Sequence, residues 1–183
     1  MKNKSFTIIE LMIAIAIVGL LAALVLIAIR DVRKRARDSV RLSDMNQIVK
    51  ALELYYDKHE KYPDNTDYGE NDCLNFDVSN ITGDEDFGPF LDPLVEEGFF
   101  SEVPLDPLNK IGSLCTPGYR YGYHRFTAAE ASAYGCDQIK PFYVLAITNM
   151  ETSSGPHSES PGWSCPGYDW QNDAEWVVGK YED

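Results

Sequence analysis

The sequence lacks the residue clusters and motifs on which catalysis depends. Its 183 residues include only three histidines, and His59, His124 and His157 are scattered along the chain. No Gly-x-Ser-x-Gly, His-Glu-x-x-His or phosphate-loop motif is present. These absences argue against an enzyme, and we predict no catalytic residue.

Basic residues are scarce beyond residue 41. Residues 42–183 hold 8 Lys and Arg against 26 Asp and Glu, a net charge of −18. So acidic a region repels phosphate backbones, which argues against nucleic-acid binding by this part of the chain. The sequence also has a single long apolar run, which excludes a multi-span transporter or channel.

That apolar run covers residues 6–29, and Glu10 is its only charged residue. As a helix, 24 residues are roughly 36 Å long, enough to cross a hydrocarbon core of about 30 Å. The run is too long for a secretory signal, whose apolar stretch has about 7–15 residues. We therefore expect one membrane anchor and one soluble domain.

The four cysteines, Cys73, Cys115, Cys136 and Cys165, all lie beyond the anchor. None forms a Cys-x-x-Cys pair, which argues against zinc. Two disulfides in an oxidising compartment are the preferred interpretation, so the domain is expected outside the cytoplasm. Three pairings are open, and the one joining sequence neighbours (Cys73–Cys115 and Cys136–Cys165) is favoured.

Glu10 is the feature that a plain anchor does not explain. A carboxylate in a membrane helix costs up to about 2.5–3.5 kcal/mol at the centre, and less near the end of the helix. Such a residue needs a partner, and we expect none from the rest of the apolar run.

Residues 5–12, Ser-Phe-Thr-Ile-Ile-Glu-Leu-Met, with the apolar run behind them, resemble the N-terminus of type IV prepilins and type II secretion pseudopilins. The resemblance implies leader cleavage between Ser5 and Phe6 by a membrane aspartyl peptidase, and N-methylation of Phe6. It also implies that Glu10 is the assembly carboxylate, paired with a neighbour's amine in a helical filament. A buried carboxylate is tolerated when a cation compensates it.

The chain departs from the family pattern at two positions. Ser5 stands where the family most often has Gly, and Ile27 where many members have Pro. Because proline removes a backbone hydrogen bond, its absence predicts a more continuous helix.

Six basic residues follow the anchor. Because Lys and Arg are usually enriched in cytoplasmic loops, these residues alone would place the domain in the cytoplasm. The cysteines and the leader motif favour the opposite orientation. Three of the six share one helical column, and we expect that column to face acidic surface on a neighbouring subunit. The six are Arg30, Arg33, Lys34, Arg35, Arg37 and Arg41, and the column is Arg33, Arg37 and Arg41.

Apolar residues at spacings of three and four continue past the anchor and predict one helix ending near His59, before Pro63. A turn-rich loop (64–88), a short helix (89–99) and three strands (119–126, 141–148, 174–181) follow. Thr127 and Glu130 predict a capping box opening another short helix, and Tyr55 and Tyr56 are assigned to core packing.

This order matches an α+β pilin fold: a long N-terminal helix, membrane-spanning in its first half, packed on a small antiparallel sheet with an αβ-loop. We divide the chain into a leader (1–5), a transmembrane and assembly helix (6–29), an amphipathic extension (30–62) and an extracytoplasmic domain (63–183). Residues 105–109 before the Tyr-rich strand also resemble G-type pseudopilins.

G-type pseudopilins bind calcium in a C-terminal loop, and acidic clusters here offer oxygen ligands. A solvated acidic surface explains the same residues more simply, so no metal site is assigned and no cofactor is required. The clusters are residues 84–86 and Asp169 with Asn172 and Asp173.

The expected function is a filament subunit, held in the inner membrane with its leader in the cytoplasm and its domain outside. The resemblance implies as partners further copies of the chain, prepilin peptidase, an inner-membrane platform with its ATPase, and membrane lipid before assembly. A type IV pilus and a periplasmic pseudopilus both remain open. The alternative is a non-polymerising, membrane-anchored binding domain, with an uncut N-terminus and a dispensable Glu10.

Overall fold

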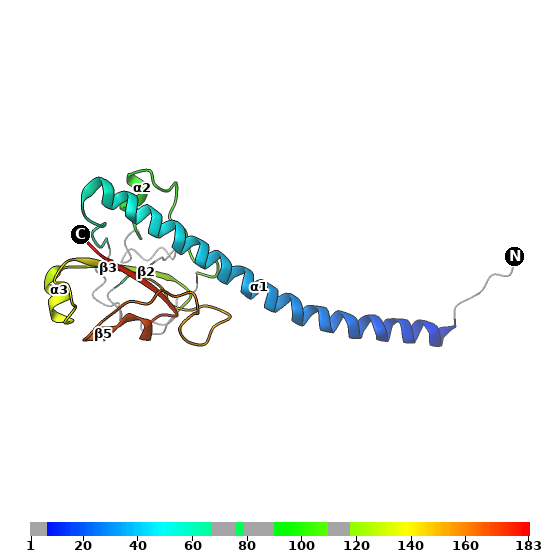
Figure 1. Cartoon of the computed structure of the whole chain (residues 1–183). Coiled ribbons are helices and arrows are strands. Elements are labelled where there is room, and N and C mark those ends of the chain that lie inside the picture. The colour runs from blue at the N-terminus through cyan, green and yellow to red at the C-terminus, as the bar shows by residue number, and fades with distance from the viewer. Residues whose placement is uncertain (1–6, 67–75, 79–89, 110–117) are drawn as a thin grey trace.

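The structure is a computed structural model that describes residues 7–66, 76–78, 90–109 and 118–183. Figure 1 shows one long helix whose C-terminal half lies on a small domain, while its N-terminal half projects away from it. This arrangement confirms the predicted α+β fold.

The long helix α1 (Ile8–His59) has 52 residues and is about 78 Å long. Thr7 caps its start in extended geometry, and Glu60, with a left-handed φ of 56°, ends it. Proline is absent from this stretch and Gly19 is its only glycine, so the residues favour an uninterrupted helix. The prediction of a helix ending near His59 is confirmed.

The second half of α1 supplies one side of the main core. Met45, Ile48 and Leu52 recur at spacings of three and four, and all are fully buried. They pack in one cluster with residues on the facing side of the sheet, among them Tyr121 and Leu145. Tyr55 and Tyr56 join the cluster as partly buried side chains, as predicted.

Four antiparallel strands form the sheet in the order β1-β2-β3-β6: β1 (Asp77–Val78), β2 (Tyr121–Phe126), β3 (Phe142–Ile147) and β6 (Trp176–Tyr181). The register pairs Tyr123 with Leu145 and Leu145 with Val178. All three predicted strands are confirmed. The two-residue β1 lies in a segment predicted as loop, because its pairing with β2 is a tertiary contact.

Two short helices flank the sheet. α2 (Asp92–Glu96) carries the buried Leu94 into the main core. α3 (Ala128–Ala133) begins with the predicted capping box, in which Thr127 and Glu130 bond each other's backbone N–H. A glycine follows each helix in a left-handed conformation, Gly98 at φ 76° and Gly135 at φ 67°.

An aromatic layer covers the face of the sheet opposite α1. Phe126, Phe142 and Trp170 meet there at ring-centroid distances of 4.7 to 5.6 Å. Between β3 and β6, the strand β4 (Ser164–Cys165) pairs with β5 (Tyr168–Asp169) before the 3-10 helix η1 (Trp170–Asn172). Strands this short depend on the core beneath them, so the local sequence does not reveal them.

Candidate functional site: the projecting helix and its junction with the domain

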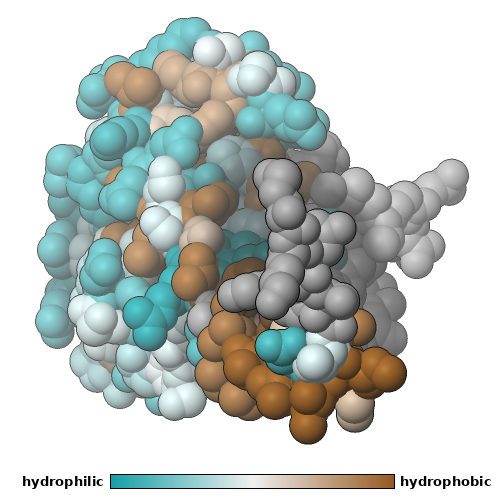
Figure 2. All heavy atoms as spheres, turned by 90° about the vertical axis from the view of Figure 1, so that its right-hand side faces the viewer, coloured by the Kyte–Doolittle hydropathy of each residue, from teal (hydrophilic) through white to brown (hydrophobic). Residues whose placement is uncertain are grey.

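The projecting part of α1 is apolar and fully open to its surroundings. Every described side chain from Ile8 to Val25 is exposed, including Ile8 at 82% and Leu20 at 65%. Figure 2 views the molecule from this end and shows brown apolar side chains gathered there, against a domain surface that is largely teal and white. Among the described residues, α1 is the one helix long and apolar enough to cross a membrane.

Glu10 lies in the first turn of α1, where it forms a capping box with Thr7. The Thr7 backbone N–H and hydroxyl donate to Glu10 Oε2 at 2.9 and 2.7 Å, and the Glu10 N–H donates to Thr7 Oγ1 at 3.3 Å. The expectation that the rest of the apolar run supplies no partner for Glu10 is therefore wrong, because Thr7 belongs to that run. Thr-Ile-Ile-Glu is itself a capping-box pattern, and the sequence could have revealed it.

The leader-cleavage and methylation residues, Ser5 and Phe6, lie outside the described residues. Their predicted roles, and the role of Glu10 in assembly, stay predictions. The helix start at Ile8 places Thr7 as the cap, so the expected cleavage site immediately precedes the structured helix.

Where α1 meets the domain, five charged residues form what we name the junction cluster: Arg37, Asp38, Arg41, Asp106 and Glu151. Arg41 is fully buried. Its Nε and Nη2 donate to the two oxygens of Asp106 at 2.6 and 3.0 Å, and its Nη1 donates to Asp38 Oδ1 at 2.5 Å. The guanidinium group of Arg37 forms a bidentate ion pair with the carboxylate of Glu151.

The junction cluster also fastens the loop after β3 to the helix. Asp38 accepts hydrogen bonds from the backbone N–H of Glu151 at 2.9 Å and of Thr152 at 2.8 Å. Burial opposes ionisation of Asp38, but the hydrogen bonds from Thr152, Glu151 and Arg41 outweigh it and lower its pKa. The hydrogen bonds from Arg37 likewise lower the pKa of Glu151.

The predicted basic column is therefore wrong for two of its three members. Arg37 and Arg41 bind carboxylates of their own chain rather than a neighbour's, because Asp106 and Glu151 come from loops that the fold brings back to the helix. Arg33 remains exposed.

Hydrogen bonds hold the C-terminus beside the end of α1, and an ion pair holds it to β2. Arg125 on β2 donates to both oxygens of Glu182 at 2.7 and 3.0 Å, and Glu182 also accepts from the Tyr62 N–H at 3.0 Å. The Asp183 N–H donates to the Tyr56 hydroxyl at 2.9 Å. Both ends of the domain are thus anchored on α1.

A disulfide joins Cys136, after α3, to Cys165 on β4, as the favoured pairing predicts. It crosses a separation of 29 residues and lies beneath the aromatic layer. Cys73 and Cys115 lie outside the described residues, so their predicted pairing stays a prediction.

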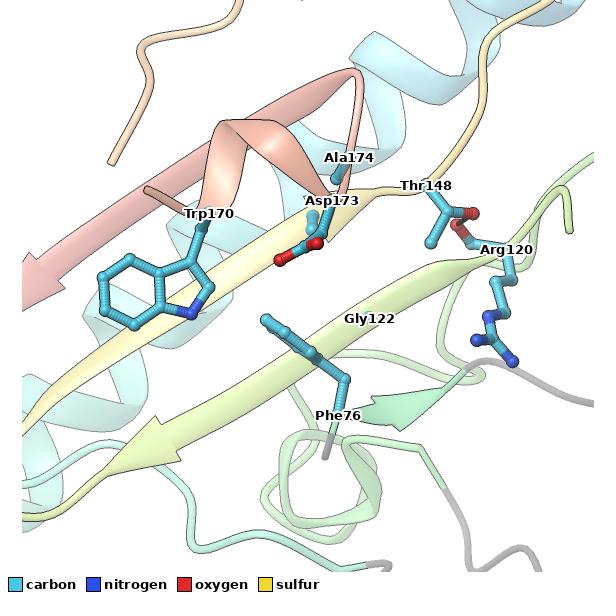
Figure 3. A pocket seen from close by; sticks show the side chains of 8 residues that line it. Phe76, Arg120, Gly122, Thr148, Trp170, Asp173 and Ala174 are labelled. Carbon is cyan, nitrogen blue, oxygen red and sulfur yellow. Dashed lines mark hydrogen bonds between the residues drawn. The ribbon is translucent and has the colours of Figure 1, made fainter. Parts of the chain in front are cut away.

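A small enclosed cavity lies on the sheet face away from α1, and Figure 3 shows Phe76 and Trp170 facing it from opposite sides with Asp173 nearby. Its lining is almost wholly apolar, and about 10 Å³ of it is free for a water-sized molecule. That space holds one water at most, so the cavity is a packing gap.

Of the acidic residues considered for calcium, residues 84–86 lie outside the described part of the chain. Asp169 accepts from the Gln171 N–H at the start of η1, and Asp173 accepts from the Tyr168 hydroxyl. The latter bond raises the pKa of Tyr168 to about 12. Within the described residues, no group of three or more His, Cys, Asp or Glu side chains is placed to hold a metal ion.

Comparison with known proteins identifies relatives for both parts of the chain. Residues 1–26 match the family model described as the prokaryotic N-terminal methylation motif. Type II secretion system core protein G of Escherichia coli is 26% identical over 140 residues, which are 74% of this chain and 88% of that protein. A second core protein G, from Pseudomonas aeruginosa, is 29% identical over 74% of this chain and 90% of its own length.

Type IV pilins match at higher identity but over less of the chain. The major pilin PilE1 of Neisseria gonorrhoeae is 47% identical over 63 residues, and the wide-pilus major component PilA4 of Thermus thermophilus is 42% identical over 66. These matches cover 34% and 36% of this chain, and 38% and 50% of the pilins. No solved structure matches significantly.

The methylation motif and the exposed apolar helix together indicate an anchor in the inner membrane. The fold consists of that helix packed on a small antiparallel sheet, and homology to core protein G extends into the sheet domain. The chain is therefore a structural, non-enzymatic subunit of the type IV pilin and type II secretion pseudopilin family, carrying the N-terminal methylation motif of prepilins.

Proposed function

We propose that this subunit polymerises into a pseudopilus of the type II secretion kind, in the manner of core protein G. This choice rests on how much of the chain each similarity covers. Similarity to core protein G spans 74% of the chain, whereas similarity to the pilins spans about a third. The N-terminal segment alone does not distinguish the two filaments. A surface type IV pilus is the second candidate, favoured by the higher identity to the major pilin, 47% over 63 residues.

The exposed apolar helix supports assembly by helix bundling. After cleavage between Ser5 and Phe6 and methylation of Phe6, the helices would leave the membrane and pack together as a filament core. They exchange lipid contacts for helix contacts, so little apolar surface meets water at any stage. The proposed partners are further copies of the chain, prepilin peptidase, and an inner-membrane platform with its ATPase.

Glu10 is the proposed assembly carboxylate. In the separate subunit Thr7 supplies its hydrogen bonds, but a neutral hydroxyl and amide leave the negative charge uncompensated. The methylated amine of a neighbouring Phe6 would supply the missing positive charge. This pairing would also set the axial register between helices.

The first experiment is intact-mass and N-terminal peptide analysis of the protein purified from membranes with and without the cognate prepilin peptidase. A chain beginning at methylated Phe6, only when the peptidase is present, is the expected result. A chain retaining residues 1–5 in both samples would instead favour the anchored, non-polymerising binding domain.

A second experiment distinguishes the two filaments. Filaments would be sought by electron microscopy on the cell surface at native expression, alongside an assay of protein secretion in a strain lacking the gene. Loss of secretion without surface filaments supports the pseudopilus. Surface filaments with normal secretion would support the pilus.

We infer that assembly requires no cofactor. Calcium binding by the acidic surface is a secondary proposal. Oxygen-rich clusters are what calcium prefers. Adding EDTA to the purified full-length protein should leave its unfolding temperature unchanged, and a drop that calcium reverses would establish a calcium site.

A further inference from the structure

Four basic residues lie on α1 between the apolar segment and the domain, and we name them the basic collar: Arg30, Arg33, Lys34 and Arg35. All four are exposed. Within the part of the chain that the structure describes, no ion pair joins the collar to an acidic side chain. One and two helical turns further on, Arg37 and Arg41 are paired within the junction cluster.

Helical geometry divides the collar into two faces. At about 100° per residue, Arg30 and Lys34 each lie within roughly 20° of Arg41 around the helix axis. Arg33 is one turn before Arg37 and flanks the same stripe. Arg35 lies roughly 120° from Arg41, on a different side of the helix.

Arg41 is fully buried against the domain, so its direction marks the side of α1 on which the domain lies. Arg30 and Lys34 therefore point to the same side, about 10–17 Å further along the axis, beyond the edge of the domain. Figure 1 shows α1 continuing past the described part of the domain, and Arg30, Arg33 and Lys34 are exposed there. Along the helix, these cations therefore lie beyond the described carboxylates that bind Arg37 and Arg41.

We propose that Arg30, Arg33 and Lys34 form a docking surface for the acidic domain of a second copy of this chain. The inference rests on the proposed polymerisation and names the residues that align one subunit's helix with another subunit's domain.

Two observations favour a second copy as the occupant. Residues 42–183 carry a net charge of −18, so the domain is complementary to the collar. The collar also extends the junction cluster, in which cations on this side of the same helix already bind carboxylates of this domain. A second domain displaced along the helix would repeat the same kind of contact.

Lys34 and Arg35 provide a matched pair for testing the proposal. Lys34→Glu and Arg35→Glu change the net charge equally, at adjacent exposed positions on different faces. We expect Lys34→Glu to lower the yield of sheared filaments by tenfold or more and Arg35→Glu to lower it less than twofold. The unfolding temperature of both full-length variants in detergent should equal that of the wild type, since both side chains are exposed.

A photo-crosslinking residue at position 33 identifies the occupant directly. In the filaments that this variant forms, crosslinks to peptides from residues 42–183 of another copy are the expected product. Crosslinks to phospholipid alone would overturn the proposal and assign the collar to membrane headgroups. Equal loss of filaments in the two charge variants would also overturn it.

The controls separate this inference from the proposed function. Wild-type filaments that disappear in Glu10→Val establish polymerisation independently of the collar. If the wild type forms no filaments in the presence of its assembly machinery, the proposed function fails and the docking surface fails with it. If it forms them and Lys34→Glu behaves as Arg35→Glu does, only the docking surface fails.

Discussion

The two halves of α1 are one continuous helix in two different environments. From Ile8 to Ala36 every described side chain is exposed, although most of them are apolar. From Arg37 onward the helix is anchored to the domain by burial, by the junction cluster and by the C-terminal contacts. The first half therefore needs a membrane or neighbouring helices to cover its apolar side chains, whereas the second half is part of a folded domain.

From this difference we infer that assembly and folding depend on separate residues of the same helix. Variants in the first half should change polymerisation and leave the domain stable. Variants in the second half should unfold the domain whether or not filaments form.

The largest expected effect on folding comes from Arg41→Met. The change leaves Asp38 and Asp106 buried without their cation, which costs about 3–5 kcal/mol. We expect the unfolding temperature of the full-length protein in detergent, followed by circular dichroism, to fall by roughly 10 °C. Arg35→Met, at an exposed position, is the control and should change the stability by less than about 0.5 kcal/mol. Equal shifts in the two variants would mean that the junction cluster does not stabilise the domain.

Removing the disulfide by Cys136→Ala with Cys165→Ala should have the next largest effect. Closing a loop of 29 residues contributes about 3–4 kcal/mol in the chain-entropy model. Under oxidising conditions, the denaturant midpoint of the double variant should lie below that of the wild type. An unchanged midpoint would show that the aromatic layer alone holds this region.

Acid should weaken the junction cluster before it affects the projecting half. The folded-state pKa values of Asp38 and Glu151 are lowered, so their contribution to stability is complete above the ordinary carboxylate pKa of about 4. It is lost as the pH falls through the lowered values. The unfolding temperature measured from pH 7 to pH 3 should decline below about pH 4.5, and less steeply in Glu151→Gln. A variant curve parallel to that of the wild type would remove Glu151 from the explanation.

The smallest effect, and the most direct comparison of the two regions, comes from the two capping boxes. Thr127→Ala removes the cap of α3 inside the domain and should cost about 1 kcal/mol of domain stability. Thr7→Ala removes the same contacts at the start of α1, where the domain is far away, so the unfolding temperature should not change. A domain destabilised equally by both changes would contradict the separation between the two halves.

Much of this arrangement could be predicted from local patterns. The apolar run, the helix through His59, the three long strands and the Thr127 capping box all depend on residues close together in sequence. The Cys136–Cys165 disulfide follows from pairing sequence neighbours. The capping box of Thr7 and Glu10 is equally local, because its pattern of Thr followed three residues later by Glu lies at the start of the apolar run.

The six basic residues that follow the apolar run show what local patterns cannot predict. In the sequence its six cations look alike, and a column of Arg33, Arg37 and Arg41 could face a neighbour. Only the folded chain brings Asp106 and Glu151 to the helix, from more than 60 residues away, and so separates the two paired cations, Arg37 and Arg41, from the exposed collar. The sequence by itself determined a membrane-length helix joined to an acidic domain, because hydrophobic length and helical periodicity are local properties. The tertiary structure alone decided which charges are neutralised within the subunit, because ion pairing depends on which distant carboxylates the fold places within reach.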